Sequence, residues 1–284
     1  DEMSSRGLGD VYKRQDVTYK DDISFKCGDL TFNLHHARGE TDDHTWIHIP
    51  EEKLIAPGDL FIWAVPNGGN PQKVQRYISD WADALDEMLK LECEIFLPGH
   101  GFPILGKKRI EKALETTSKF LRSIEDQTLK LMNQGKSLNQ VLHEVEIPND
   151  LMELPWLTPI YDDPQFLIRM IWRRYGGWWD GEYDRLLPAP RKEEALAWVE
   201  LSNGIDNIIL KALENLNKGN LKVAAQLIET AFHADNDNDQ MHDARAKIYR
   251  EFSLKQSSSM GRNILNHASM ASAQGKRDLA QTED

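Results

Sequence analysis

Residues His35 to Trp46 read His-His-Ala-Arg-Gly-Glu-Thr-Asp-Asp-His-Thr-Trp, residues Pro57 to Leu60 read Pro-Gly-Asp-Leu, and residues Leu97 to Gly101 read Leu-Pro-Gly-His-Gly. Each segment places an ionisable side chain beside a glycine, at the end of a run that is typical of a β-strand. A rigid sheet that presents such side chains on its loops can hold metal ligands. The glutamate, the aspartate and the last histidine of these segments are therefore candidate ligands.

Two apolar runs separate the first candidate, Glu40, from the second, Asp59. Residues Thr45 to Pro50 alternate between apolar and polar side chains, and Lys53 to Ala56 form a short apolar run. This pattern predicts two strands joined by a polar turn at residues 51–52. Glu40 and Asp59 would then face the edge of one pocket.

The third candidate, His100, follows another strand pattern at Glu94 to Leu97, after a helix predicted from about Pro71 to Lys90. Upstream of Glu40, short apolar runs separated by Asp-Asp and Gly-Asp turns predict a β-meander. These runs cover residues 17–19, 23–27 and 30–34. The N-terminal part of the chain is thus predicted to be a sheet with one crossing helix.

The order Gly-Glu, Gly-Asp and Leu-Pro-Gly-His-Gly, each after a strand, resembles the C-terminal half of a metallo-β-lactamase-fold hydrolase. That superfamily usually has a His in the first position, whereas its alkylsulfatase branch has a Glu, as here at Glu40. The resemblance implies that Glu40 binds one zinc ion, Asp59 bridges two, and His100 binds the second. It also implies a metal-bound hydroxide as nucleophile.

These residue types suit that chemistry. Imidazole and carboxylate are good zinc ligands, and a carboxylate between two cations offsets their repulsion. A zinc pair lowers the pKa of bound water, so that the water can attack at neutral pH. A single Gly-Asp is by itself more often a turn, but three segments in this order favour the metal site.

Complete enzymes of the resembled fold carry an earlier H-x-H-x-D-H segment, which this sequence does not contain. The nine histidines are residues 35, 36, 44, 48, 100, 143, 233, 242 and 267. We therefore expect residues 16–125 to be the C-terminal half of an αββα catalytic domain, inactive alone and weak in zinc binding. Residues 1–15 are expected to be an artefact, because Asp10 to Gln15 match the translation of a transposon end used in sequencing libraries.

The loop after Asp59 is rich in turn-forming residues. In the resembled alkylsulfatases an arginine within a Leu-Arg-Gly-Ala segment grips the sulfate, and that segment is absent here. Arg76 is the nearest cation, with Asn67 and Asn70 as neutral donors, and an arginine fork suits a tetrahedral anion. An alternative is that Arg76 is a solvated residue on the helix surface, so sulfate specificity stays open.

The sequence changes to helical periodicity after the candidate ligands. Residues 107–134 show a long amphipathic pattern, and Ser137 looks like the cap of a shorter helix that ends near residue 147. We place the domain change near residue 125.

An aromatic stretch in this helical part resembles the start of the alkylsulfatase dimerisation domain. It comprises Tyr161 to Phe166 and a Tyr-Gly-Gly-Trp-Trp-Asp-Gly turn. By the resemblance, Tyr175, Trp178 and Trp179 would reach over the metal site and enclose the substrate. The alternative is that these aromatic side chains pack two helices together.

Residues 126–271 would form this dimerisation domain, followed by a disordered tail at 272–284. Helical patterns cover residues 193–202, 204–218, 221–234 and 239–253. The pair around Gly219 resembles a tetratricopeptide-type hairpin, and Arg262 to Leu265 resemble the closing segment of the dimerisation domain. The expected architecture is an α/β half-domain followed by an all-α domain that forms a homodimer.

Composition limits the classes of partner. The 284 residues carry a formal net charge of −12, which argues against nucleic acid and anionic membrane surfaces. No apolar run approaches the roughly 20 residues of a transmembrane helix, so we expect a soluble protein. The two cysteines, Cys27 and Cys93, suggest neither a disulfide framework nor a structural zinc site, although one bridge between them stays open.

The sequence therefore predicts a zinc-dependent alkyl sulfate ester hydrolase in the full-length parent, with two zinc ions in a complete site. One alternative is a metallo-hydrolase of another ester, a lactone or thioester. The other is a non-catalytic helical module for self-association. Substrate chain length, C–O or S–O cleavage, and a cytoplasmic, periplasmic or secreted location all stay open.

Overall fold

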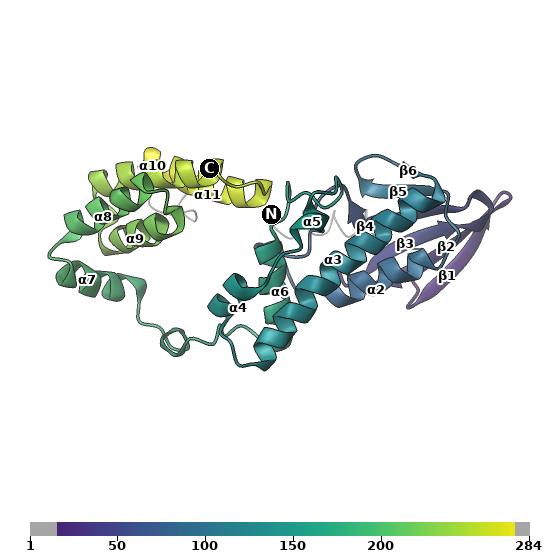
Figure 1. Cartoon of the computed structure of the whole chain (residues 1–284), viewed down its shortest axis with the longest axis horizontal. Coiled ribbons are helices and arrows are strands. Elements are labelled where there is room, and N and C mark those ends of the chain that lie inside the picture. The colour runs from purple at the N-terminus through teal and green to yellow at the C-terminus, as the bar shows by residue number, and fades with distance from the viewer. Residues whose placement is uncertain (1–15, 276–284) are drawn as a thin grey trace.

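A six-stranded sheet forms one end of the molecule (Figure 1). The computed structural model describes residues 16–275. The strands lie in chain order and pair antiparallel, except that β4 and β5 are parallel. They are β1 (Asp22–Cys27), β2 (Leu30–Ala37), β3 (His44–Ile49), β4 (Leu54–Ile62), β5 (Ile95–His100) and β6 (Ile104–Leu105). The parallel pair needs a crossover, which contains helix α2 (Ile78–Leu89).

The predicted β-meander is confirmed for two of its three runs, which form β1 and β2. It is wrong for residues 17–19, which lie outside the strands of the described chain. Strand β2 already pairs with β1 on one side and β3 on the other, so its backbone offers no free edge. Tyr19 instead contacts the sheet through a hydrogen bond between its hydroxyl and Thr45 Oγ1.

The predicted pair of strands around residues 51–52 is confirmed, with a short 3₁₀ helix η1 (Pro50–Glu52) as the turn. However, Asp59 lies within β4 and not after it. The pairing with β5 is irregular at this point, with register shifts on both sides of Gly58, whose φ is +58°. Asp59 therefore lies at an irregular part of β4, next to Gly58, and not in a loop after the strand.

The predicted helix from Pro71 to Lys90 begins later than expected, at Ile78. Residues 71–77 form a loop, and the N–H of Tyr77 donates to the carbonyl of Gly39 over 3.0 Å. Arg76 therefore precedes the helix and is only 5% exposed. Tertiary contacts of this loop outweigh its helical pattern.

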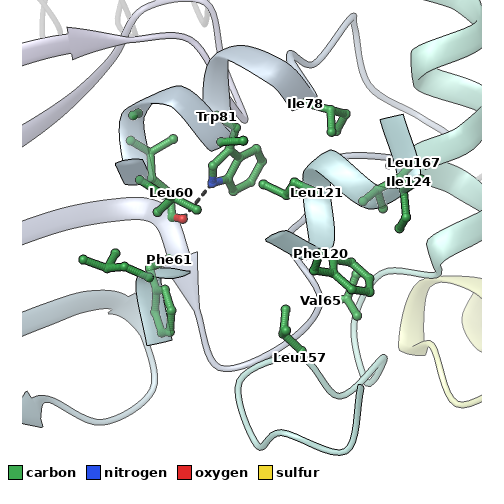
Figure 2. Packing of buried hydrophobic residues seen from close by; sticks show 14 of the residues in the cluster. Leu60, Phe61, Val65, Ile78, Trp81, Phe120, Leu121, Ile124, Leu157 and Leu167 are labelled. Carbon is green, nitrogen blue, oxygen red and sulfur yellow. Dashed lines mark hydrogen bonds between the residues drawn. The ribbon is translucent and has the colours of Figure 1, made fainter. Parts of the chain in front are cut away.

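The main hydrophobic core lies between the sheet and helices α2 and α3 (Lys107–Asn133). Figure 2 shows Trp81 in this core, where its indole N–H donates to the carbonyl of Leu60 over 2.7 Å. Phe120, Leu121 and Ile124 of α3 pack into the same cluster. The core therefore holds β4, which carries Asp59, against the two helices.

The long helix predicted from residue 107 is confirmed as α3, and the boundary predicted near residue 125 lies inside it. Ser137 caps α4 (Leu138–Glu144) through a capping box with Gln140, as its sequence indicated. Two more helices follow, α5 (Asn149–Met152) and α6 (Pro164–Gly176). The same core continues from the sheet to Trp172 on α6, so packing is continuous across residue 125.

The remaining elements are helical. They are η2 (Tyr183–Arg185), α7 (Arg191–Leu201), α8 (Ile205–Asn217), α9 (Leu221–Ala234), α10 (Asp239–Leu254) and α11 (Ser259–Ala273). Helices α8, α9 and α10 share a second core around Ile228 and Ile248. Figure 1 shows α7 to α10 at the opposite end of the molecule from the sheet. The four predicted helices are thus confirmed, while a tetratricopeptide-type geometry stays a prediction.

The disordered tail predicted from residue 272 begins too early. Ser272 belongs to α11, is 3% exposed, and accepts a hydrogen bond from Arg245 over 2.9 Å. Residues 276–284, and the expected artefact at residues 1–15, lie outside the described range. Cys27 and Cys93 are both free thiols. Within residues 16–275, no helix combines the length and apolar character that crossing a membrane requires.

Candidate active site

Glu40, Asp59 and His100 come from three separate segments and line one cavity of about 430 Å³. Glu40 lies in the loop between β2 and β3, Asp59 lies in β4, and His100 ends β5. Because β4 and β5 are parallel neighbours, Asp59 and His100 meet at one edge of the sheet. The three predicted ligands are therefore brought together, and their role as ligands stays a prediction.

Asp59 lies between the other two predicted ligands. His100 Nε2 is 3.5 Å from Asp59 Oδ1, and the carboxyl of Glu40 shares a hydrogen bond with Asp59. Gly99 permits this close approach, because a Cβ at residue 99 would lie 2.2 Å from Asp59 Oδ1. This central position is the one that a bridging carboxylate needs.

Glu40 is the most enclosed of the three, with 15% of its side chain exposed against 39% for Asp59 and 75% for His100. Arg76 donates to Glu40 Oε1 over 2.8 Å, and Asn67 Nδ2 donates to the same oxygen. Burial and the hydrogen bond with Asp59 raise the pKa of Glu40 above its usual value, and the charge of Arg76 opposes this shift. Two charged carboxylates this close repel each other, and a divalent cation bound between them would offset that repulsion.

The donor set fits zinc in residue type and in the central position of Asp59. Within residues 16–275, however, no three or more His, Cys, Asp or Glu side chains gather closely enough to hold a metal ion. Structural and catalytic zinc sites have about four ligands. A zinc ion here would thus need donors beyond those that the described residues bring together.

The rest of the cavity is largely apolar. Ile62, Trp63 and Ala64 follow Asp59 along the chain, and Ile160 and Tyr161 come from the segment that precedes α6. The cavity therefore combines a polar side with an apolar side. Such a site suits a molecule with a charged head and an apolar body.

The sequence does not predict that Ile160 and Tyr161 line the pocket. Their side chains are 54% and 41% exposed, and no local pattern connects them with a site formed from β4 and β5. The one available signal was the aromatic run from Tyr161 to Phe166, which we interpreted only as the start of a domain. Their position follows from long-range packing.

The predicted substrate-binding residues near the loop occupy different positions. Asn67 lines the cavity, whereas Arg76 lies behind Glu40 as a buried ion-pair partner. Asn70 is 9% exposed, does not line this cavity, and accepts a hydrogen bond from the N–H of Gln72. Binding of a sulfate group by these three residues stays a prediction.

The predicted aromatic lid lies away from the cavity in the described chain. The hydroxyl of Tyr175 donates to Glu125 over 3.0 Å, and the indole of Trp179 donates to the carbonyl of Glu182 over 2.9 Å. Trp178 is 76% exposed. Ile160 and Tyr161 line the cavity instead, and contact of Tyr175, Trp178 and Trp179 with a substrate stays a prediction.

The helical part of the chain matches a known family. The family model for alkyl sulfatase dimerisation matches residues 137–275. The chain carries an alkyl sulfatase dimerisation domain. This domain begins with α4 and includes Ile160 and Tyr161, so the alkyl sulfatase dimerisation domain contributes directly to the cavity.

Curated relatives of the chain are alkylsulfatases. It is 25% identical over 236 residues to a linear primary-alkylsulfatase from Pseudomonas sp. (strain ATCC 19151), covering 82% of this chain and 45% of that protein. It is 26% identical over 201 residues to an alkyl/aryl-sulfatase from Saccharomyces cerevisiae, covering 69% of this chain and 31% of that protein. The chain thus spans less than half the length of these relatives.

The fold has a counterpart among solved structures. The stereoselective inverting sec-alkylsulfatase Pisa1 from Pseudomonas sp. aligns with a TM-score of 0.85 at 22% sequence identity, over 91% of this chain and 42% of that one. The sheet, the crossing helices and the alkyl sulfatase dimerisation domain together therefore form an alkylsulfatase-like fold.

Proposed function

We propose that the protein hydrolyses alkyl sulfate esters at a metallo-β-lactamase-type zinc site that includes Glu40, Asp59 and His100. The observation that carries this proposal is the cavity, which joins these three side chains to the apolar wall of Ile160 and Tyr161. An alkyl sulfate has an anionic head, which zinc held by these three side chains would attract, and an apolar chain, which suits the apolar wall. The similarity to alkylsulfatases supports the same reaction class.

Each group in the cavity has a role in this proposal. Zinc would supply a Lewis acid that activates water and polarises the ester. Asp59 would help to hold the zinc together with Glu40 and His100, while Arg76 and Asn67 hold the carboxylate of Glu40 in place. Trp63 and Tyr161 would exclude water and orient the alkyl chain.

A second candidate within the same fold is hydrolysis of a lactone or thioester. The absence of the Leu-Arg-Gly-Ala segment favours it, because Arg76 is engaged with Glu40 and does not line the cavity. Inhibition by inorganic sulfate separates the two reactions, since only a site that recognises a sulfate head is expected to bind the free anion. Inhibition by dodecanol would indicate recognition of the alkyl chain alone.

A third candidate is a non-catalytic module for self-association. The alkyl sulfatase dimerisation domain favours self-association, and we propose a homodimer formed through its helices, including a tetratricopeptide-type hairpin of α8 and α9. The same surface would serve an active enzyme, so homodimer formation and hydrolysis are compatible. Metal binding separates the module from the enzyme.

Zinc titration of the purified chain against a fluorescent chelator tests the metal assignment. We expect Glu40→Gln, Asp59→Asn and His100→Ala each to lower the zinc affinity by about tenfold or more, because each removes a donor. The titration extends to millimolar zinc, since weak binding is expected from an incomplete ligand set.

The matched control is His35→Ala. His35 and Asp22 form a second His–Asp pair, 2.6 Å apart, that lies outside the cavity. Its loss is expected to leave the zinc affinity unchanged. Equal affinities in the wild type and all three ligand variants would contradict the metal assignment and favour the self-association module.

A further inference from the structure

Asp162 is a fully buried carboxylate next to the apolar wall of the cavity. Its Oδ2 accepts the N–H of Gly69 over 2.8 Å, and its Oδ1 accepts the N–H of Asp163 over 2.7 Å. The bond to Gly69 joins two segments that are far apart in the sequence. Removing a carboxylate from water costs free energy of desolvation, which its hydrogen bonds offset only in part. We therefore expect Asp162 to have a structural or functional role.

The loop that Asp162 holds contains a direct partner of Glu40. Asn67, two residues before Gly69, donates its side-chain amide to Glu40 Oε1. The backbone carbonyl of Asn67 also accepts a hydrogen bond from Arg76, which in turn donates to Glu40 over 2.8 Å. The loop therefore holds Glu40 both directly and through Arg76.

Close packing on the other side prevents this loop from adjusting freely. A Cβ at Gly69 would lie 2.2 Å from the carbonyl carbon of Phe166 and 2.4 Å from the nitrogen of Leu167. The loop thus rests against the backbone at the start of α6. The buried hydrogen bond from the N–H of Gly69 to Asp162 then fixes the position of the loop against α6.

Asp162 also acts on Arg76 through charge. Arg76 is 5% exposed, and Asp162 attracts it electrostatically in addition to its ion pair with Glu40. Within the described residues, Arg76 Nε lacks a hydrogen-bond partner. Its bonds to Glu40 and to the carbonyl of Asn67 hold the guanidinium, and a charged Asp162 attracts it as well.

We propose that Asp162 is a positioning residue of the candidate active site, which sets the orientation of Glu40 through the Gly69 loop and Arg76. This inference rests on the proposed function, because it treats Glu40 as a metal ligand. Groups that orient metal ligands from behind commonly change metal affinity by about 10- to 100-fold when they are removed.

Zinc affinity in Asp162→Ala and Asp162→Asn variants, measured with Zn²⁺ and a competing chelator, tests this proposal. We expect Asp162→Ala to weaken zinc binding by about tenfold, and Asp162→Asn to weaken it less because the amide keeps one acceptor oxygen. Hydrogen exchange of the peptide that contains Gly69 should accelerate in Asp162→Ala. Should the alanine variant fail to fold, the asparagine variant alone decides, with a reduced zinc affinity expected.

The matched control is Asp163→Ala at the neighbouring position. Asp163 caps α6 by accepting the N–H of Gln165 over 2.9 Å, so its loss costs stability but leaves in place the hydrogen bond between Asp162 and the N–H of Gly69. We expect its zinc affinity to equal that of the wild type. Equal zinc affinities in the Asp162 and Asp163 variants, together with a loss in Glu40→Gln, would refute the positioning role alone. An unchanged affinity in Glu40→Gln would instead overturn the proposed function, and this inference with it.

Discussion

Two glycines explain why the Pro-Gly-His-Gly segment carries a ligand. A Cβ at Gly99 would lie 2.2 Å from Asp59 Oδ1, and a Cβ at Gly101 would lie 2.1 Å from Trp63 Cδ1. Gly101 also has a φ of +101°, which side chains other than glycine rarely adopt. Because neither residue that flanks His100 has a side chain, this segment can pack closely against Asp59 and Trp63.

At the same scale, Asp162 should make stability depend on pH. Burial raises the pKa of Asp162 to about 7, although two N–H groups favour its charged form. An unfolded aspartate titrates near pH 3.9, so between about pH 4 and 7 only the folded chain retains this proton. Because deprotonating the buried carboxyl costs free energy in the folded chain, the free energy of unfolding is expected to decrease as pH rises through this range.

Asp162→Asn removes this titration. We expect its free energy of unfolding to fall less steeply than that of the wild type between about pH 4 and 7, by at most about 4 kcal/mol at 1.36 kcal/mol per pKa unit. Urea unfolding at several pH values measures the difference, with Asp163→Asn as the control. Parallel pH profiles for wild type and Asp162→Asn would show that Asp162 does not titrate there.

At the scale of elements, α11 supports the apolar wall of the cavity. The N–H of Ser259 donates to the carbonyl of Ile160 over 2.9 Å, and Ser258 Oγ donates to the carbonyl of Tyr161 over 2.7 Å. Ser258 is also the N-cap of α11, where it accepts the N–H of Gly261. The start of the last helix is thus part of the support of the candidate active site.

Ser258→Ala should therefore cost more stability than the loss of an ordinary cap. We expect about 2 kcal/mol, of which about 1 comes from the cap and about 1 from the buried bond to Tyr161. Asn238→Ala is the matched control, because Asn238 caps α10 through Met241 and should cost about 1 kcal/mol. Equal losses in urea unfolding would show that the bond to Tyr161 does not stabilise the chain.

At the scale of the whole molecule, the sheet and helices α7 to α10 lie at opposite ends (Figure 1). One hydrophobic core extends from the sheet to α6, and a second one lies among α8, α9 and α10. Helix α7 is the least buried of the long helices, with Ala195 as its one buried residue. Leu196, Trp198 and Leu201 are 49%, 54% and 74% exposed on it. Trp198 and Leu201 lie about 60° apart around the helix at about 100° per residue, and neighbouring exposed apolar side chains can contribute to a protein interface.

We expect α7 to contribute to the proposed homodimer. Trp198→Glu should weaken self-association by about tenfold or more, because it places a charge where an aromatic side chain would be buried. Leu254→Glu is the control, since Leu254 is 65% exposed on α10. Sedimentation equilibrium over a range of concentrations measures both variants. Equal dimer affinities would place the interface elsewhere.

The sequence by itself determined the elements and the candidate ligands. Hydrophobic periodicity and capping residues act locally, so β1 to β3, α3, α4 and α7 to α10 were predicted near their observed positions. Strands β4 and β5 were predicted to end before Asp59 and His100, but they include these residues. The motifs around Glu40, Asp59 and His100 were also visible, because glycines beside ionisable residues are local features.

Only the tertiary structure decided what surrounds these ligands. Arg76 became a buried partner of Glu40 because its loop packs against other segments instead of continuing α2. Tyr161 became part of the cavity because Ser258 and Asp162 hold its segment from two sides. Contacts between residues far apart in the chain depend on how the elements pack, and no local pattern records that packing.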